Sequence, residues 1–459
     1  MSILWNSLSQ FGSSVYNKYN KVTNFTGDDW KNVETPAYSI TPDFTAVHKK
    51  IHYTLRRSLK YGNHFISSLV ARNAGNGGNI LWETGFTLTT PPTTQNAYST
   101  WPLGLHILPN GNPVVGYNLN STSFELTTLD TSGNFASSVV VQGTNMGTFT
   151  IDAVGNIYSY SSNRVRKSSP SGILIWEVII DRVMLLGNIL SVGDHQSIYV
   201  AGLSSSLAIS GGELQTIIKL DANTGNKIWS HEYVAVDPAT GVSYTAVRNR
   251  IQRLGYDKSL QRIVAIGVTG DGTPGTLNTY DLTFTIFDAS GTRLSSTRTF
   301  DVKNGVAHLR DATWMGITND QKAIIGSYRT EPGFVNTTLP ILEYDLNTTG
   351  IVNAITPSGT IPSATPLVDV NDVNEIYITR NPVSNGNDVE TVKLHNLSAI
   401  SFPRHGYSYI TPPTLTVWNP PDSTVLSVAQ NPTPNTTAAP RPSTITLTHT
   451  IPIETLTII

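Results

Sequence analysis

The sequence predicts an all-β protein, a six- to seven-bladed β-propeller with a short N-terminal helix and an extended C-terminal arm. Two observations predict this fold class. The first is a turn phrase, clearest in LDANTGNKIWSHEY at residues 220–233, which recurs with variations along the chain. The second is a composition that suits strands and tight turns better than helices. Units of four short strands repeating every ~40–65 residues indicate a propeller, whose blades bury their faces against one another.

The composition fits a folded protein with a polar, weakly charged surface. The chain has 459 residues, of which 39% are hydrophobic and only 14% are charged. That is enough for one large all-β domain with a core. The net charge of -2, without any block of like charges, argues against direct nucleic-acid recognition and against an anionic membrane as partner. The one basic concentration, within residues 48–60, is interpreted as a solvated face or a protein contact.

The absence of cysteine excludes disulfides, cysteine-bound zinc, iron–sulfur clusters and thiol catalysis. The first residues lack the basic region and uninterrupted apolar run of a secretory signal. No stretch approaches the ~18 apolar residues that a membrane-spanning helix needs. We therefore expect synthesis in a host cytoplasm and no membrane span.

Residues 1–42 are predicted to form a helix and a linker that together act as a docking segment. Leu4, Leu8, Phe11 and Val15 fall on one face of a helix, and Trp5 lies beside that face. A helix of about four turns is not stable alone. It either packs on its own domain or anchors the chain to another subunit, and the sequence leaves both readings open.

Residues 43–402 are predicted to form the propeller. Each unit has an earlier turn before the recurring phrase, hence two hairpins and four strands. Whether residues 44–82 form a blade of their own, or one completed by residues near 407–418, stays open. The glycines predicted to close the second turn of a unit in a left-handed conformation are Gly133, Gly172, Gly225, Gly291 and Gly350.

Residues 403–459 are predicted to form an extended arm that ends in a β-strand. The arm is rich in Pro, Thr and Asn, and proline lacks the N–H group that a central strand needs. Its last residues regain strand-like alternation, and Ile451, Ile453, Leu456 and Ile458 are candidate docking residues. Whether the final strand pairs in cis or in trans stays open.

The units resemble the repeats of pyrroloquinoline-quinone-type and WD-like propellers. Their typical phrase is matched by Leu220, Asp221, Ala222, Thr224, Gly225, Lys227 and Trp229, and partly by residues 173–176 and 287–291. The resemblance covers residues 43–402 and implies structural roles, in which Asp caps the turn and Trp packs between blades. The overall layout also resembles structural proteins of bacteriophage particles, such as tail nozzles, fibre-attachment proteins and capsid decorations.

We expect no catalytic residue, metal site or cofactor. His48 and His52 are four residues apart but lack the acidic partner of an HExxH motif, and residues 269–275 and 369–375 hold only part of a calcium-loop pattern. The GxSxG, P-loop and GxGxxG motifs are absent, whereas paired carboxylates for glycoside cleavage stay open. The quinone-type repeat implies a dehydrogenase, but such enzymes are typically exported and many use a vicinal cysteine pair. We therefore expect a protein that is not an enzyme.

The preferred hypothesis is a non-enzymatic component of a virus particle, a phage tail nozzle or fibre-attachment platform. Such a protein would be located in the virion, contact other virion proteins and form a homo-oligomer through its terminal segments. The alternative is a propeller that binds a host-surface glycan through blade loops, with Trp101 or Trp314 as contact residues. The second alternative is a quinoprotein-like enzyme.

Overall fold

The computed structural model describes the chain in blocks separated by gaps. The blocks are residues 19–22, 29–34, 40–60, 64–75, 78–88, 102–120, 123–142, 148–161, 163–180, 184–191, 196–205, 213–234, 249–270, 280–299, 308–330, 337–338, 340–357, 366–380, 389–398, 407–418, 428–430 and 445–450. These residues contain strands and turns and no helix. The predicted helix with Leu4, Leu8, Phe11 and Val15 lies outside them. Among the described residues, no helix of a length and apolarity that would cross a membrane is found.

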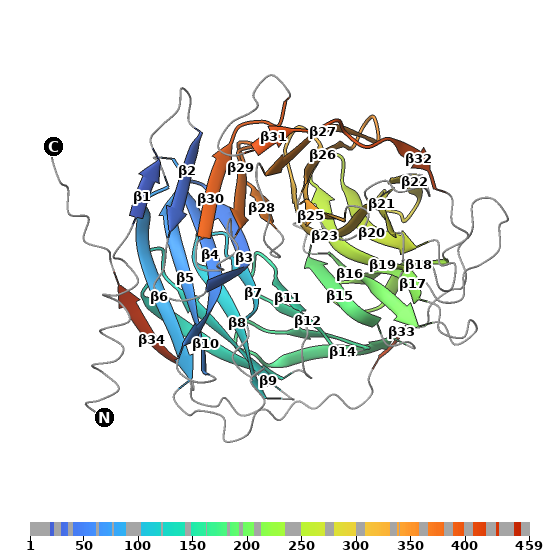
Figure 1. The fold of residues 1–459 in the computed structure, drawn as a ribbon. Helices are drawn as coiled ribbons and strands as arrows, with labels where there is room; N and C mark the ends of the chain where they lie inside the picture. The colour runs from blue at the N-terminus through green and yellow to red at the C-terminus, as the bar shows by residue number, and fades with distance from the viewer. Residues whose placement is uncertain are drawn as a thin grey trace.

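The described strands form seven antiparallel sheets arranged as a ring (Figure 1). The innermost strand of each sheet contacts the innermost strands of both neighbouring sheets, and the seventh contacts the first. The fold is therefore a closed seven-bladed β-propeller, within the predicted range of six to seven blades. Residues 44–82 belong to a blade of their own, which answers the question that the sequence left open.

Blades 1 to 4 follow the chain in order, each from its inner to its outer strand. They comprise β3 (Ile40–His48), β4 (Ile51–Lys60), β5 (His64–Asn73) and β6 (Ile80–Leu88); β7 (Pro102–Ile107), β8 (Pro113–Asn120), β9 (Ser123–Leu129) and β10 (Phe135–Gln142); β11 (Thr148–Ile151), β12 (Ile157–Ser161), β13 (Arg164–Ser168) and β14 (Leu174–Ile180); and β15 (Met184–Ser191), β16 (Ser197–Ser205), β17 (Glu213–Asp221) and β18 (Lys227–Val234).

Blades 5 and 6 continue this order, and blade 7 takes strands from both ends of the described chain. They comprise β19 (Asn249–Asp257), β20 (Arg262–Gly270), β21 (Tyr280–Phe287) and β22 (Arg293–Thr299); β23 (His308–Ile317), β24 (Lys322–Thr330), β26 (Ile341–Asp345) and β27 (Gly350–Pro357), with the short β25 (Thr337–Thr338) beside β24; and β28 (Leu367–Val370), β29 (Ile376–Arg380), β30 (Val389–Leu394), β2 (Trp30–Glu34) and β1 (Tyr19–Val22).

The tight turns follow from the residue types that the sequence supplies. In blade 4, one carboxylate oxygen of Asp221 accepts the N–H groups of Asn223 and Thr224 at 2.9 and 2.8 Å, and Gly225 has φ of +74°. The same combination of side-chain cap and left-handed glycine closes the turns at Gly133, Gly172 and Gly291. At the predicted Gly350 the left-handed residue is instead Thr349, with φ of +53°.

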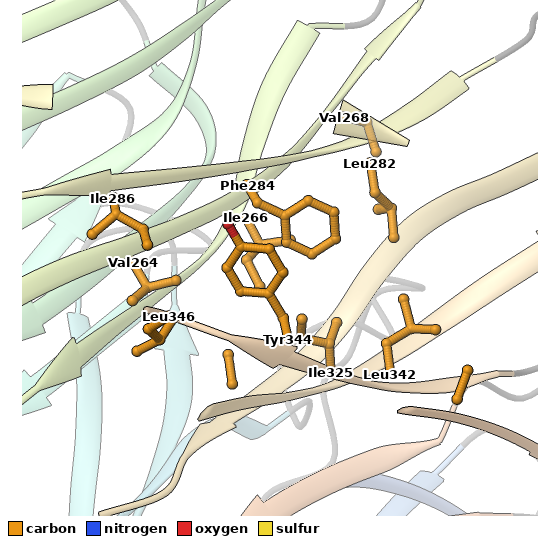
Figure 2. Close-up of a cluster of buried hydrophobic side chains, with 12 residues drawn as sticks. Val264, Ile266, Val268, Leu282, Phe284, Ile286, Ile325, Leu342, Tyr344 and Leu346 are labelled. Carbon is orange, nitrogen blue, oxygen red and sulfur yellow. The ribbon is translucent and has the colours of Figure 1, made fainter. Parts of the chain in front are cut away.

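The core is divided among the interfaces between neighbouring blades, where apolar side chains of adjacent sheets interdigitate. Figure 2 shows the interface of blades 5 and 6, where Phe284 and Tyr344 stack with ring centroids 4.6 Å apart and planes at 13°. Five other interfaces hold comparable clusters. Each blade thus depends on two neighbours for its burial, which makes the ring one cooperative unit.

The ring is closed by residues that the sequence analysis assigned to the N-terminal docking segment. β2 pairs with β30 along its whole length, from Trp30 opposite Lys393 to Glu34 opposite Val389, and β1 pairs with β2. The propeller therefore includes residues 30–34, which lie before the predicted boundary at residue 43.

The C-terminal arm runs around the outside of the ring and adds a fifth strand to four blades (Figure 1). β31 (Tyr407–Tyr409) pairs with β27 of blade 6, and β32 (Leu415–Val417) pairs with β22 of blade 5. β33 (Val428–Gln430) pairs with β14 of blade 3, and β34 (Ile445–Thr450) pairs with β6 of blade 1. The final described strand thus pairs in cis. The four arm strands are called the belt below.

Candidate functional site: the outer rim and the axis

Three tryptophans lock one blade to the next in the same way. Each indole N–H donates to a backbone carbonyl oxygen in the outer turn of the next blade, the turn between that blade's third and fourth strands. The acceptor is the second residue of this turn. The donors and acceptors are Trp82 and Thr131 at 2.9 Å, Trp176 and Ala222 at 3.2 Å, and Trp229 and Ala289 at 3.4 Å. The recurring Trp therefore has the inter-blade packing role that the resemblance implied.

A lysine on the adjacent strand reinforces two of these locks. Lys167 Nζ donates to the same Ala222 carbonyl at 2.9 Å, and Lys219 Nζ donates to the Ala289 carbonyl at 2.7 Å. Each lysine pairs in register with the lock tryptophan of its blade, Trp176 or Trp229. A charged donor strengthens a hydrogen bond to a carbonyl, so the pair holds the neighbouring turn from two sides.

The register defines the same position, called the lock position, in every blade. The outer strand of a blade begins after a turn and a β-bulge. The lock position is the first residue of the outer strand, after this bulge, that pairs with the third strand. The lock position holds Trp82, Ser137, Trp176, Trp229, Ser295 and Asn353 in blades 1 to 6. In blade 7 the corresponding residue is Trp30, opposite Lys393 as Trp176 is opposite Lys167.

Within the described residues, the C-terminal arm places side chains into three interfaces, two whose lock position lacks tryptophan and one, between blades 4 and 5, where Trp418 is buried beside the lock residue Trp229. Tyr407 of β31 is completely buried in the apolar cluster between blades 6 and 7, with the Arg380 guanidinium 4.7 Å from its ring centroid. Leu415 of β32 packs against the cluster between blades 5 and 6. Fifth strands therefore stabilise the ring through side chains as well as through backbone pairing.

Ring closure in blade 7 depends on ionic contacts between the two ends of the chain. Asp29 accepts the backbone N–H of His395 at 2.9 Å and also contacts the imidazole Nδ1 of the same residue. The Glu390 carboxylate bonds Lys31 of β2 at 2.6 Å and Arg380 of β29 at 2.8 Å. In the other blades a continuous chain turn joins the third and fourth strands. In blade 7 these non-covalent contacts join the third strand, β30, to the fourth, β2.

The interface between blades 7 and 1 differs from the other six in being largely polar. Among the described residues, its apolar cluster contains Ala74, Tyr377 and the partly buried Val47. Arg56, Arg72 and Lys393 are completely buried there or beside it, and Arg56 bonds Glu83 at 2.8 Å. The basic run within residues 48–60 is thus only partly a solvated face, since Lys49 and Lys50 are exposed whereas Arg56 is enclosed.

Two ionisable side chains at this interface have strongly shifted pKa values. Burial lowers the pKa of His52 to about 3, so the imidazole is neutral; it stacks on Tyr377 and bonds the Thr45 hydroxyl at 2.7 Å. Burial raises the pKa of Asp369 to about 7, although its carboxylate accepts the Val47 N–H at 2.6 Å. The interface therefore changes charge near neutral pH.

A small group of side chains meets at the axis of the ring. Phe44 of blade 1 and Trp314 of blade 6 are in edge-to-face contact, 5.7 Å between centroids. Because blade 7 lies between these two blades, their rings meet only by projecting toward the axis. The Arg253 guanidinium of blade 5 lies 5.4 Å from the Trp314 ring, and β-bulges precede both Phe44 and Arg253. Bulges of this kind re-aim side chains.

The structure describes only part of the residues that the sequence analysis selected. Leu4, Trp5, Leu8, Phe11, Val15, Ile451, Ile453, Leu456, Ile458 and Trp101 lie outside the described residues. Trp314, expected in an exposed blade loop, is instead a partly buried residue of the inner strand β23. His48 and His52 lie on two paired strands and do not have a helical spacing.

The part of the chain with a described structure shows no cluster of three or more His, Asp or Glu side chains that could hold a metal ion. Asn371, within the calcium-like stretch at 369–375, instead caps a turn, accepting the N–H groups of Val373 and Glu375 at 3.1 and 2.8 Å. Glu375 bonds Lys393 at 2.6 Å. These oxygens are engaged in turn formation and ion pairing.

No protein-family model matches the chain, and no curated protein matches it. Among solved structures, the quinohemoprotein alcohol dehydrogenase ADHIIG from Pseudomonas putida HK5 is similar with a TM-score of 0.40 and 11% identity, over 81% of this chain and 76% of that one. The quinohemoprotein alcohol dehydrogenase from Comamonas testosteroni gives 0.43 and 10%, over 84% and 80%. BBS1N in complex with ARL6DN gives 0.41 and 8%, over 83% and 98%.

Proposed function

We propose that the chain is a non-enzymatic assembly protein of a virus particle, a rigid ring that acts as a phage tail nozzle or fibre-attachment platform. The observation that carries this proposal is the placement of the chain ends. β1 and β34, the first and last described strands, add to the outer edges of blades 7 and 1, which are neighbours (Figure 1). Tyr19 and Thr450, the first and last described residues, therefore lie on neighbouring blades, next to the segments that carry the predicted docking residues.

The belt supports the same proposal in physical terms. A propeller opens most easily where its ends meet, and here five blades carry a fifth strand, so that opening requires several additional strands to detach. The belt strands are only three to six residues long, and short outermost strands offer less template for unwanted association. A ring reinforced in this way suits a component that transmits load within a particle.

The test compares two sets of substitutions within the same terminal segment. Replacing Leu4, Trp5, Leu8 and Phe11 by serine should abolish incorporation of the protein into particles or oligomers while leaving the melting temperature of the ring unchanged. Replacing the interspersed Asn6, Ser7, Ser9 and Gln10 by alanine is the matched control and should have no effect. Normal incorporation of the first variant, measured by sedimentation and by mass of the native assembly, would contradict the proposal.

A second candidate function is recognition of a host-surface glycan, which the aromatic group at the axis favours. Trp314 and Phe44 offer ring faces and edges, and Arg253 offers hydrogen-bond donors, the kinds of groups that bind sugars. Specific binding of the intact protein to a glycan array, lost in Trp314→Ala, would support it. Absence of binding to every glycan would remove this candidate.

We also propose that the protein has no catalytic activity. The support is the assignment of the recurring Asp, Gly and Trp residues to turns and blade locks. Purified protein with the absorbance of a bound quinone, or with dye-linked alcohol oxidation, would overturn this part of the proposal.

A further inference from the structure

The interface of blades 2 and 3 has neither a lock tryptophan nor a described side chain from an added fifth strand, the two features that fill other interfaces. The lock position of blade 2 holds Ser137, opposite Thr128, where blades 3 and 4 hold Trp opposite Lys. Blade 2 also lacks a fifth strand within the described part of the chain, since its sheet ends at β10. Both short side chains leave space that an indole and a lysine occupy elsewhere.

A cavity of about 630 Å³ lies at this place. It extends from Thr128, Ser137 and Val139 of blade 2 to Gly155, Pro170 and Gly172 in the turns of blade 3. All residues that line it are uncharged. Its size falls within the usual range of ligand sites, ~300–1,000 Å³. The cavity is called the blade 2–3 notch below.

The interfaces after blades 5 and 6 show which side chains fill the space that a missing lock tryptophan leaves. Blade 6 also lacks Trp at its lock position, and there Tyr407 from an added strand is buried in the next interface. In blade 5, which holds Ser295, Leu415 from an added strand packs into the next interface. In these two blades without a lock tryptophan, an added strand brings a large apolar side chain into the next interface; added strands also lie on blades 1 and 3, which have a lock tryptophan. Blade 2, also without a lock tryptophan, is the exception among the described residues.

We propose that the blade 2–3 notch is a docking site for an extended strand of another protein, which pairs with the open edge of β10 and inserts an aromatic side chain. Strand addition provides backbone hydrogen bonds, and the pocket selects the side chain. The uncharged lining selects against Lys, Arg, Asp and Glu at the inserted position. This inference rests on the proposed assembly function for the source of the strand, a neighbouring protein of the particle.

The sequence of the chain's own arm does not predict this strand. Residues 431–444 connect β33 on blade 3 to β34 on blade 1, and they contain no aromatic residue. They contain Pro432, Pro434, Pro440 and Pro442, and proline cannot donate to a ladder. The connection from β32 on blade 5 to β33 on blade 3 likewise contains Pro420 and Pro421.

The test measures binding of a fluorescent peptide copying residues 403–413, the arm segment that carries Tyr407, to the intact full-length protein. We expect saturable binding that Ser137→Trp weakens at least tenfold, because the indole fills the notch. A peptide with Tyr407→Ala should lose affinity to a similar extent. Ile175→Ala is the matched control and should leave binding unchanged, because Ile175 is an exposed residue of β14, which pairs with β33 at residues 178–180.

Hydrogen exchange of the same samples locates the peptide independently of the variants. The bound peptide should slow exchange of amides in β10 and not in β18, the other open outer edge. Absence of binding to the wild-type protein, binding that Ser137→Trp leaves intact, or protection confined to other strands would each overturn the proposal. Failure here leaves the terminal-segment assay of the assembly function unaffected, so the two proposals are tested separately.

Discussion

Asp29 accepts the backbone N–H of His395 at 2.9 Å although 366 residues separate the two along the chain. The contact joins the start of β2 to the end of β30, where blades 1 to 6 have a continuous turn. Asp29 thereby has the role that Asp221 has within the turn of blade 4, namely capping backbone N–H groups. Blade 7 thus has a turn whose two halves come from opposite ends of the propeller.

We expect Asp29→Ala to lower the free energy of unfolding by about 1.5–3 kcal/mol, the usual loss for a hydrogen bond to a charged group that is nearly buried. Urea unfolding followed by tryptophan fluorescence measures the effect. Asp221→Ala is the matched control: it removes a cap from a continuous, more exposed turn and should cost less. An equal loss in the two variants would show that Asp29 has no special part in ring closure.

Truncating a lock tryptophan should be among the most costly single changes. Trp176→Ala removes a buried indole and its bond to Ala222, and such changes typically cost ~3–5 kcal/mol. Ile175→Ala, the neighbouring residue that is 50% exposed, should change stability by less than ~0.5 kcal/mol. Thermal unfolding of the two variants and the wild type measures the difference. Similar melting temperatures for Trp176→Ala and the wild type would contradict the assignment of Trp176 as a lock.

The same substitution at two lock positions should have opposite effects. Ser137→Trp fills the blade 2–3 notch and should stabilise the ring by roughly 0.5–2 kcal/mol, as cavity-filling changes do. Ser295→Trp should destabilise by about 1–3 kcal/mol, because the interface after blade 5 is already filled by Tyr344, Leu415 and Ile410. Calorimetry of both variants tests the pair. Equal destabilisation by both would mean that the notch cannot accept an indole.

The Asp369 carboxyl should make stability depend on pH in an unusual direction. Because its pKa is raised to about 7, the folded state retains a proton that the unfolded chain has lost above pH ~4. Stability contributed by this group therefore falls as the pH rises from about 4 to 7, by on the order of 2–4 kcal/mol. Asp369→Asn keeps an acceptor for the Val47 N–H and should flatten this decline.

Asp288→Asn is the control for the pH experiment, because the hydroxyl of Ser290 and nearby N–H groups lower the pKa of Asp288. Relative to the wild type, that variant should lose stability as the pH rises toward the usual Asp pKa of ~4, and the difference should then stay constant between pH 4 and 7, unlike the effect at Asp369. Unfolding curves at a series of pH values for the three proteins give the comparison. A decline between pH 4 and 7 that persists unchanged in Asp369→Asn would contradict the assignment.

The propeller could be predicted because the sequence pattern that specifies each hairpin is local and is repeated along the chain. Asp221, Gly225 and Trp229 lie within nine residues, and each copy of the phrase forms the same hairpin. The pairing of Trp30 with Lys393 could not be predicted in this way, because β2 lacks the preceding turn that marks the other outer strands. The same limitation applies to β31, β32 and β33 of the belt, whose three residues carry too little pattern to specify a partner edge, whereas the six-residue β34 was predicted as a strand without its partner.

Part of the candidate site was nevertheless present in the sequence. Aligning GNFAS at residues 133–137 with GNKIW at residues 225–229 places Ser137 where Trp229 stands, and that departure from the repeat marks the notch. The lysine that shares each lock was not recognised, because its partner carbonyl lies in the next blade, 55 residues away for Lys167 and Ala222. The axial contact of Phe44 with Trp314 depends on closure of the whole ring, which no local pattern reports.

The route of the belt has a consequence for the order of folding. Blades 1 to 6 follow one another along the chain, whereas the belt strands pair with blades 6, 5, 3 and 1 in the reverse direction. A nascent chain therefore exposes the outer edge of blade 1 until β34 has been synthesised. Blade 7 likewise waits for β30 before β2 has a partner. Closure of blade 7 and pairing of the belt strands are consequently late steps. A prematurely terminated chain lacks both, and its open strand edges make the incomplete product recognisable to proteases.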